Sequence, residues 1–329
     1  MPPNDAPARG VGSASAHHGE ILQGVFRNGK DHHLKRALVT LQCPGWKSYA
    51  TFFPASQQAD IICMPGMWKA RRAAILSMQE FSSGSSPVTG GCVEICSDVP
   101  RGIGMGSSTA DVTATIRAIA DFHGATPTTE QIARIAVAAE CASDPIMIDD
   151  RIVLFSHREG SVLEVFGHQL PAMIVVGCEA DPGTESIDTI ALPPAVYSAA
   201  DIEVFSFLRA ELRTAVAAGD VARLARVATS SAVISQRFLP KLAFDFLLDL
   251  CQRAGGCGVQ VAHSGTVAGI IFDSRRDGVM ASVDRCVAGI QKAGLSLTGV
   301  ITCRQPAAVA LPTATAVSGT AGRTAARHQ

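Results

Sequence analysis

Residues 100–110 read Pro-Arg-Gly-Ile-Gly-Met-Gly-Ser-Ser-Thr-Ala, with glycine at every second position from 102 to 106. Before this run, residues 92–96 alternate and include β-branched side chains, which predicts a strand. After it, residues 110–123 place Val112, Ile116 and Ile119 at helical spacing. The sequence therefore predicts a tight strand-to-helix turn built from glycine and hydroxyl residues.

Such a turn has the chemistry of an anion site. Glycine lets the backbone approach a ligand closely, and the first N–H groups of a helix have no internal partner. The helix dipole also favours negative charge there. The run is not a Walker A loop, because no Lys-Ser/Thr pair follows the glycines, and Thr109 occupies the third glycine position of a dinucleotide fingerprint. The turn alone leaves phosphate binding and a purely structural role equally open.

The complete run resembles the Pro-x-x-x-Gly-Leu-Gly-Ser-Ser-Ala-Ala motif of the GHMP kinases, the family of galactokinase, homoserine kinase and mevalonate kinase. Met105 replaces the leucine and Thr109 the first alanine. These kinases carry three motifs in a fixed order. Residues 255–258 and 263–266 are candidates for the third motif. Residues 16–24 match the first motif loosely, without its usual basic residue.

One branch of the family is more similar than the others. The string Gly-Glu-Ile-Leu-Gln-Gly at residues 19–24 resembles the opening of the L-threonine kinases of cobalamin biosynthesis. The segments 262–266 and 183–189 are also similar to that branch. Two departures lie near the expected acceptor site: His17 and His18 replace small residues, and residues 140–144 lengthen a Glu-Pro-Thr-Asp signature by one position.

These departures leave the acceptor open. The resemblance implies an ATP-dependent kinase of an amino-acid hydroxyl, with L-threonine as the first candidate and O-phospho-L-threonine as the product. Serine, homoserine, a sugar or a specialised metabolite are alternative acceptors. A catalytically silent nucleotide-binding sensor is the alternative from another functional class.

The resemblance also implies the fold, an α+β GHMP kinase architecture of two domains. We predict a ribosomal-S5-like N-terminal domain at residues 13–158 and a ferredoxin-like C-terminal domain at residues 159–305. Residues 1–12 and 306–329 have compositions typical of disordered segments.

ATP and Mg²⁺ are the cofactors that the resemblance implies. Mg²⁺ takes few protein ligands and prefers oxygen, and Ser108 and Glu140 are the predicted ligands. The predicted nucleotide-binding residues all belong to the glycine-serine run: Pro100, Gly102, Gly104, Met105, Gly106, Ser107, Ser108 and Thr109.

The acceptor is predicted to meet a different set of side chains. Asp144 is the first candidate to orient or deprotonate the acceptor hydroxyl, and Asp149 is the second, because the altered spacing leaves the register open. Glu20 would bind an ammonium group, and Arg237 is a weaker candidate for the carboxylate. The other predicted substrate residues are His18, Gln23, Ser264, Gly265 and Thr266, the last three as donors to a carboxylate.

Local sequence patterns predict further strands and helices and argue against a metal site near residue 19. Two strands are expected at residues 36–43 and 47–54, separated by a Pro44-Gly45 turn. Residues 12–24 are expected to form a loop or edge strand, and Gly19 argues against a metal site built from the nearby histidines and Glu20. Helices are expected at residues 67–81, 128–142, 201–218, 221–229, 238–252 and 278–293.

Composition narrows the functional class. Hydrophobic residues make up 47% of the 329-residue chain and charged residues 17%, which excludes wholesale disorder. A net charge of −1 gives no electrostatic case for binding nucleic acid or a membrane surface. The ten cysteines form no Cys-x-x-Cys pair and are typical of a reducing compartment. We expect a cytoplasmic enzyme with a small-molecule substrate, with a homodimer left open.

Overall fold

The computed structural model describes residues 9–29, 33–55, 60–82, 90–183 and 195–303. Within them the strands are β1 Gly10–Arg27, β2 Leu34–Pro54, β3 Ile61–Cys63, β4 Gly91–Ser97, β5 Ile152–Ser156, β6 Ser161–Gly167, β7 Met173–Glu179, β8 Gly258–Val261, β9 Val267–Asp273 and β10 Leu297–Cys303. The α-helices are α1 Trp68–Phe81, α2 Ser107–Phe122, α3 Thr129–Glu140, α4 Ala199–Ala218, α5 Val221–Ser235, α6 Phe244–Ala254 and α7 Val279–Lys292, and Pro145–Met147 forms one 3₁₀ turn.

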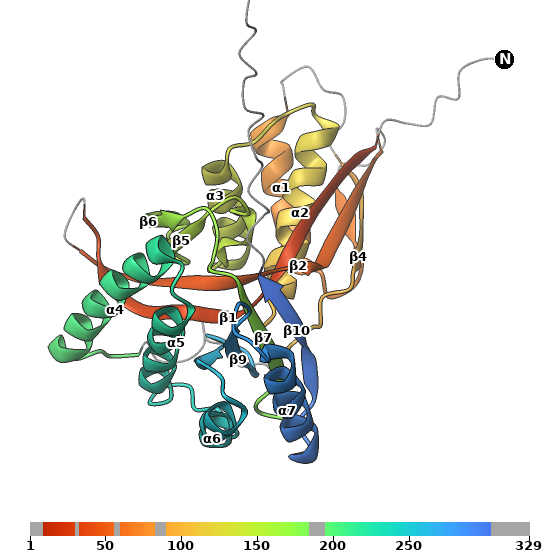
Figure 1. Cartoon of the computed structure of the whole chain (residues 1–329). Coiled ribbons are helices and arrows are strands. Elements are labelled where there is room, and N and C mark those ends of the chain that lie inside the picture. The colour runs from red at the N-terminus through yellow and green to blue at the C-terminus, as the bar shows by residue number, and fades with distance from the viewer. Residues whose placement is uncertain (1–8, 30–32, 56–59, 83–89, 184–194, 304–329) are drawn as a thin grey trace, which may run out of the picture.

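One sheet connects both halves of the chain. Its order is β10-β7-β9-β8-β1-β2-β4-β3, and β5 pairs with β2 and β6. The two halves meet where Glu20 of β1 lies opposite Val261 of β8. Figure 1 shows the long β1–β2 ribbon crossing the molecule, with α1, α2 and α3 on one side of it, α5, α6 and α7 on the other, and α4 across its left end. The sheet therefore carries β1 into the middle of the molecule.

The C-terminal strands follow the predicted ferredoxin-like pattern. The chain runs strand, helices, strand, strand, helix, strand, and the spatial order β10-β7-β9-β8 places the fourth strand beside the first. The adjacent pairs are antiparallel. The predicted boundary at residues 158 and 159 falls in the β5–β6 hairpin, whose strands pair with each other. The division into two domains stays a prediction.

Three expectations about the first fifty residues are wrong. Residues 10–12 belong to β1, so the predicted disorder does not extend to them, and residues 1–8 lie outside the described residues. Residues 12–24 lie between β2 and β8 instead of at a sheet edge. The Pro44-Gly45 pair does not end a strand. In the pairing of β1 with β2, Ser15 lies opposite Lys47, and the next residue, Ala16, lies opposite Cys43. Proline lacks the N–H that a ladder needs, so the extra residues form a bulge inside β2.

The helices lie close to their predicted positions, except that α5 extends to Ser235 instead of residue 229 and α6 starts later than predicted. α6 begins at Phe244 instead of residue 238, because Pro240 disfavours helical backbone in the residue before it. The predicted capping box at Thr128 and Gln131 is present at the start of α3. No helix in the described part of the chain is long and apolar enough to cross a membrane. The predicted tail at residues 306–329 lies outside the described residues.

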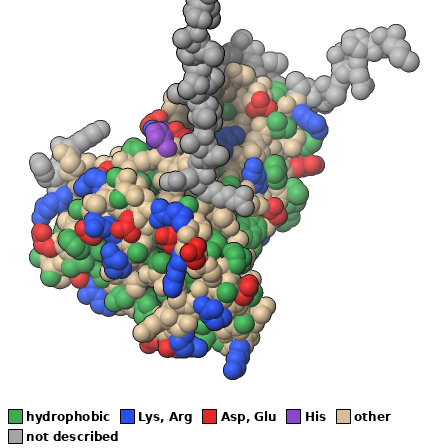
Figure 2. All heavy atoms as spheres, in the orientation of Figure 1, with side chains coloured by type: hydrophobic (Ala, Val, Ile, Leu, Met, Phe, Trp, Pro, Cys, Tyr) green, Lys and Arg blue, Asp and Glu red, His purple; other side chains and the backbone are tan. Residues whose placement is uncertain are grey.

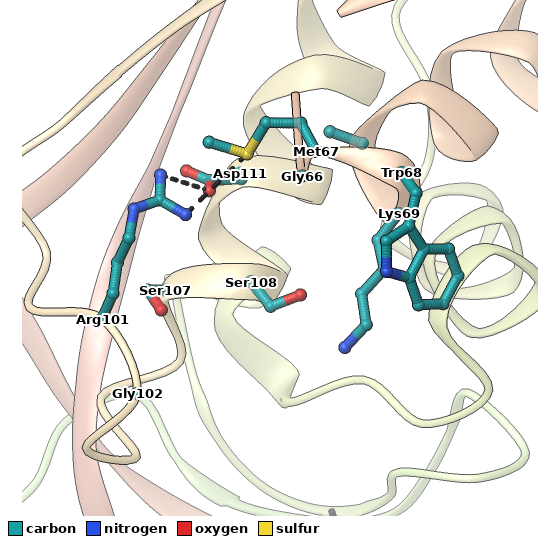
Figure 3. Close-up of a pocket in the computed structure, with 10 residues that line it drawn as sticks. Gly66, Met67, Trp68, Lys69, Arg101, Gly102, Ser107, Ser108 and Asp111 are labelled. Carbon is teal, nitrogen blue, oxygen red and sulfur yellow. Dashed lines mark hydrogen bonds and ion pairs between the residues drawn. The ribbon is translucent and has the colours of Figure 1, made fainter. Parts of the chain in front are cut away.

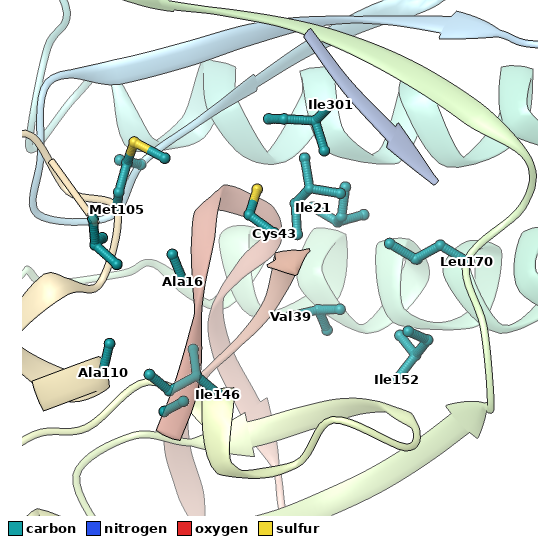
Figure 4. Packing of buried hydrophobic residues seen from close by; sticks show 14 of the residues in the cluster. Ala16, Ile21, Val39, Cys43, Met105, Ala110, Ile146, Ile152, Leu170 and Ile301 are labelled. Carbon is teal, nitrogen blue, oxygen red and sulfur yellow. The ribbon is translucent and has the colours of Figure 1, made fainter. Parts of the chain in front are cut away.

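The main hydrophobic core unites segments that are distant in the sequence. Figure 4 shows Ile21 of β1, Met105 of the glycine loop and Ile301 of β10 in one cluster. The surface is mixed by contrast: Figure 2 shows Lys, Arg, Asp and Glu side chains interspersed over one face of the described residues. The glycine loop is thus anchored in the core through Met105, which fixes its position beside β1.

Candidate active site

The glycine loop packs backbone to backbone against two other segments. Gly104 has φ +90°, and a Cβ atom there would lie 2.5 Å from the Cα of Gly265. Gly106 has φ +71°, and a Cβ atom there would lie 2.3 Å from Cδ2 of His17. Only glycine combines this backbone conformation with such close approach. The loop, β1 and the turn after β8 therefore meet at one point.

The turn Ser264-Gly265-Thr266 supports the glycine loop. The backbone N–H groups of Thr266 and Val267 donate to the carbonyl oxygen of Ile103 at 2.9 and 3.1 Å. The Thr266 side chain is 1% exposed, and its hydroxyl donates to Glu179 at 3.5 Å. The expectation that this turn binds a substrate carboxylate is therefore wrong for Thr266, whose donors are occupied within the protein.

A hydroxyl–carboxylate pair lies at the N-terminus of α2. Ser108 Oγ donates to Glu140 Oε2 at 3.1 Å, and Thr109 Oγ1 donates to Glu140 Oε1 at 2.9 Å. Lys69 Nζ lies 3.8 Å from the same carboxylate. Burial raises the pKa of Glu140 to about 7, although the Lys69 charge opposes this shift. One hydroxyl and one carboxylate oxygen suit Mg²⁺, which takes oxygen ligands and retains several waters.

A pocket of about 240 Å³ opens beside this pair. Figure 3 shows the Ser108 hydroxyl and the Lys69 ammonium pointing into the same space, with Trp68 beside Lys69. Arg101 forms a 2.9 Å ion pair with Asp111 at another side of the pocket. The pocket is lined by Gly66, Met67, Trp68, Lys69, Ala70, Arg101, Gly102, Ser107, Ser108 and Asp111.

Sequence reasoning missed the pocket residues that α1 supplies. Trp68 and Lys69 are the first residues of α1, and Trp68 is one of only two tryptophans in the chain. An exposed tryptophan beside a lysine at a helix start is the signal that points to a binding surface. Met105, by contrast, was predicted to bind nucleotide, but its side chain is buried in the core. Its contribution is structural: its carbonyl oxygen accepts the backbone N–H of His17 at 3.2 Å.

The predicted catalytic Asp144 is paired with a histidine. His17 Nε2 lies 2.9 Å from Asp144 Oδ2, and the aspartate side chain is 27% exposed. Burial acts to raise the pKa of Asp144, but the His17 charge and hydrogen bond outweigh it and lower the pKa to about 2. Burial also acts to lower the pKa of His17. The charge of Asp144 and its hydrogen bond outweigh this effect, and the pKa of His17 is raised. Each group therefore favours the charged form of the other.

The second catalytic candidate lies elsewhere. The Asp149 side chain is 65% exposed and lies 3.5 Å from Arg117. Arg117 follows Ser108 by nine positions on α2, or about 13 Å along a helix that rises 1.5 Å per residue. The structure does not bring Asp149 together with Asp144 and the glycine loop.

His18 was predicted to bind substrate, but both of its ring nitrogens have protein partners. Nε2 lies 2.8 Å from Thr298 Oγ1, and Nδ1 lies 2.7 Å from Gln260 Nε2. The side chain is fully buried, and burial lowers its pKa to about 4. His18 is therefore a neutral structural residue that joins β1 to β8 and β10.

This burial predicts a pH dependence of stability that His18→Gln should reduce. The folded-state pKa lies below the ordinary value of 6.5, so only the unfolded chain binds a proton as the pH falls from 6.5 toward 4. The free energy of unfolding therefore falls as the pH is lowered through that range. At pH 5 it is about 2 kcal/mol lower than it would be if His18 kept its ordinary pKa in the folded state. Urea unfolding of wild type and variant at pH 7.5 and pH 5 measures the difference. An equal pH dependence in both proteins would contradict the assignment.

A second group of polar side chains surrounds a narrow pocket whose lining includes His157 and His263, two histidines close enough to Asp144 to affect its pKa. Gln23 Oε1 lies 2.8 Å from His263 Nδ1, and the His263 and His157 rings are 5.3 Å apart. Arg36 and Tyr197 line the same pocket. Arg237 lies outside it and pairs with Asp201 at 2.7 Å on the surface. Gln23 and Arg36 line the same pocket, and substrate binding by Gln23 stays a prediction; Arg36 is a basic residue that sequence reasoning did not single out.

Glu20 completes this region. Its side chain is 2% exposed, and burial raises its pKa to about 8. The carboxyl group lies beside His17 and Asp144, since charge interactions with both contribute to that pKa. Residues 184–189, the other segment similar to the threonine kinase branch, lie outside the described residues.

Comparison with known proteins agrees with this architecture. A model of the GHMP kinases N terminal domain matches residues 69–151. The L-threonine kinase of Citrobacter freundii is 32% identical over 201 residues, which cover 57% of this chain and 64% of that relative. The match thus spans less than two thirds of the relative's length.

Solved structures share the fold at low identity. Homoserine kinase from Cytophaga hutchinsonii aligns with a TM-score of 0.67 and 13% identity over 91% of this chain and 95% of its own. A structure in complex with MVAPP, AMPPCP and magnesium aligns with a TM-score of 0.63 and 12% identity over 90% of this chain and 98% of its own. These two likenesses establish the α+β fold. Residues 69–151 match the GHMP kinases N terminal domain, and the chain has the same α+β fold as the homoserine kinase structure.

Proposed function

We propose that this protein transfers the γ-phosphate of ATP to the hydroxyl group of a small molecule, and that the acceptor is L-threonine. The observation that carries the proposal is the meeting of Ser108 and Glu140 at the N-terminus of α2, beside the pocket that Lys69, Gly102 and Ser107 also line. The choice of threonine is supported by the relative named L-threonine kinase.

The nucleotide end of the reaction uses charge and backbone donors. The first N–H groups of α2 face the phosphates, and Lys69 supplies a positive charge on the opposite side of the pocket. Ser108 and Glu140 would hold Mg²⁺. The ion, when bound, neutralises charge on the phosphate oxygens. The protein's contribution is to align ATP with the acceptor, which is the main catalytic requirement of phosphoryl transfer.

At the acceptor end, Asp144 orients the hydroxyl group. A carboxylate with a pKa of about 2 is a weak base, so Asp144 serves better as a hydrogen-bond acceptor than as a proton acceptor. His17 holds the carboxylate in place at 2.9 Å. Phosphoryl transfer through a loose transition state places little demand on a base. Arg36 is our candidate partner for the acceptor carboxylate, and the predicted ammonium partner Glu20 stays a prediction.

The test is ADP release from MgATP with L-threonine, L-serine, L-homoserine, a sugar and mevalonate as acceptors, with Ser108→Ala as the inactive control. Turnover with threonine alone, lost in the control, is expected. Turnover with another acceptor would support the proposed kinase activity but show that threonine is not the acceptor. ATP binding without turnover on any acceptor would contradict the proposal and favour the nucleotide sensor.

Replacing Asp144 by asparagine is expected to lower kcat by about 10- to 100-fold, because a misplaced acceptor hydroxyl costs rates of this order. The amide keeps the shape of the side chain but loses the charge that pairs with His17. Steady-state kinetics with MgATP and threonine measures the effect. Asp149→Asn is the matched change at the exposed position and should leave kcat within about twofold. Near-normal turnover of Asp144→Asn, or a larger loss in Asp149→Asn, would move the role away from Asp144.

A further inference from the structure

Three metal-ligating side chains converge next to the glycine loop. One ligand atom each from His17, Glu20 and Asp144 lies within 4.8 Å of the other two. His17 and Glu20 belong to β1, and Asp144 immediately precedes the Pro145–Met147 turn. We call these three residues the His-Glu-Asp cluster. In the described part of the chain it is the one group of at least three such side chains with this spacing.

The cluster contains two buried polar atoms without a hydrogen-bond partner. Glu20 Oε2 is buried and has no hydrogen bond, and His17 Nδ1 is likewise unpartnered. A buried carboxyl oxygen without a partner costs free energy, so native proteins rarely keep one unless a ligand or water satisfies it. This orphaned oxygen is independent of the spacing of the three side chains. A positively charged ligand bound in the cluster would satisfy this oxygen.

The donor atoms favour a metal ion over other cations. Once an ion displaces the proton that pairs His17 with Asp144, an imidazole nitrogen with two carboxylate oxygens suits first-row transition ions such as Zn²⁺, Co²⁺ and Mn²⁺. An ammonium group would gain hydrogen bonds only from the two carboxylates, and Mg²⁺ prefers ligand sets made of oxygen alone. Three protein ligands also leave a coordination position open, as in catalytic metal sites.

We propose that the His-Glu-Asp cluster binds one divalent transition-metal ion, separate from the magnesium that Ser108 and Glu140 would hold. The partly exposed Asp144 gives the ion access from solvent. The bound ion would link β1 to the segment before the 3₁₀ turn. It would also lie beside the glycine loop, because the His17 backbone donates to Met105 and its ring contacts Gly106.

Cobalt titration of the metal-depleted full chain, without nucleotide, tests the proposal. We expect one Co²⁺ per chain with visible d–d absorption and no thiolate charge-transfer band, which separates this site from binding by the ten cysteines. Glu20→Gln and Asp144→Asn should each weaken Co²⁺ binding at least about 10-fold, since both remove a ligand. Asp150→Asn, the same change at an exposed neighbour paired with Arg151, should have no effect. Ser108→Ala should also retain Co²⁺ binding.

Glu20→Gln keeps the side-chain volume, and circular dichroism with thermal unfolding verifies that both variants fold. Absence of a bound Co²⁺ or Mn²⁺ ion would overturn the proposal, as would equal binding in the wild type and both variants. If L-threonine binds in a Glu20-dependent manner while Co²⁺ does not bind, the cluster is an ammonium site and the metal proposal is wrong. The readout needs no catalysis, so its failure leaves the proposed kinase function untouched.

Discussion

Replacing Glu140 by glutamine is expected to lower kcat/KM for MgATP by about 100- to 1000-fold, the cost of removing one group that stabilises charge in a transition state. The amide cannot serve Mg²⁺ as an anionic ligand. It also leaves the Lys69 ammonium, now 3.8 Å from the carboxylate, without its partner. Both consequences act at Ser108, where we propose that the phosphates bind.

Steady-state kinetics at varied Mg²⁺ concentration measures this effect and should show that more Mg²⁺ is needed for half-maximal rate. Glu130→Gln is the matched control, because Glu130 is an exposed glutamate in the first turn of the same helix. The control should leave activity unchanged. Activity of Glu140→Gln within a few-fold of wild type at every Mg²⁺ concentration would show that Glu140 is not a metal ligand.

Gly104→Ala is expected to reduce ATP affinity at least about 10-fold and to destabilise the fold by about 2–3 kcal/mol, through backbone strain together with a backbone clash. The new Cβ would lie 2.5 Å from the Cα and 2.9 Å from the backbone nitrogen of Gly265. Because both are backbone atoms, no side-chain rotation relieves the contact. The loop must therefore move away from the turn that supports it.

Gly102→Ala separates the two causes. Gly102 has φ +80°, close to that of Gly104, but a Cβ atom there would meet nothing within 4 Å. Gly102→Ala should therefore lower the free energy of unfolding by about 1 kcal/mol, the strain of placing alanine at a positive φ. Urea unfolding and calorimetric titration with ATP compare the two variants. Equal losses in both would show that the contact with Gly265 is unimportant.

Part of the candidate site follows from local sequence. The strand β4, the glycine loop and the start of α2 lie where the pattern of glycines and apolar residues predicts them. The resemblance added the expectation that Glu140 works with Ser108, and the two are hydrogen bonded. Their partner Lys69 was not predicted, because nothing in the order of residues links the start of α1 to the end of α3.

The acceptor side shows the limit of such reasoning. His18 and Thr266 have the right chemistry for substrate binding, but their polar groups are already paired inside the protein. Asp144 and Asp149 are five positions apart, yet one meets His17 and the other faces solvent. Residue type alone does not distinguish a group that is free from one that is already paired.

The sequence by itself determined the glycine-serine loop between β4 and α2, most helices and strands, and the resemblance to the GHMP kinases. These depend on backbone preferences and on residues within one or two turns of each other. The tertiary structure decided which polar groups are buried, paired or available. The His17–Asp144 pair spans 127 positions and the His18–Gln260 pair spans 242. Such partnerships, and the pKa shifts that burial produces, arise only when the sheet brings β1 between β2 and β8.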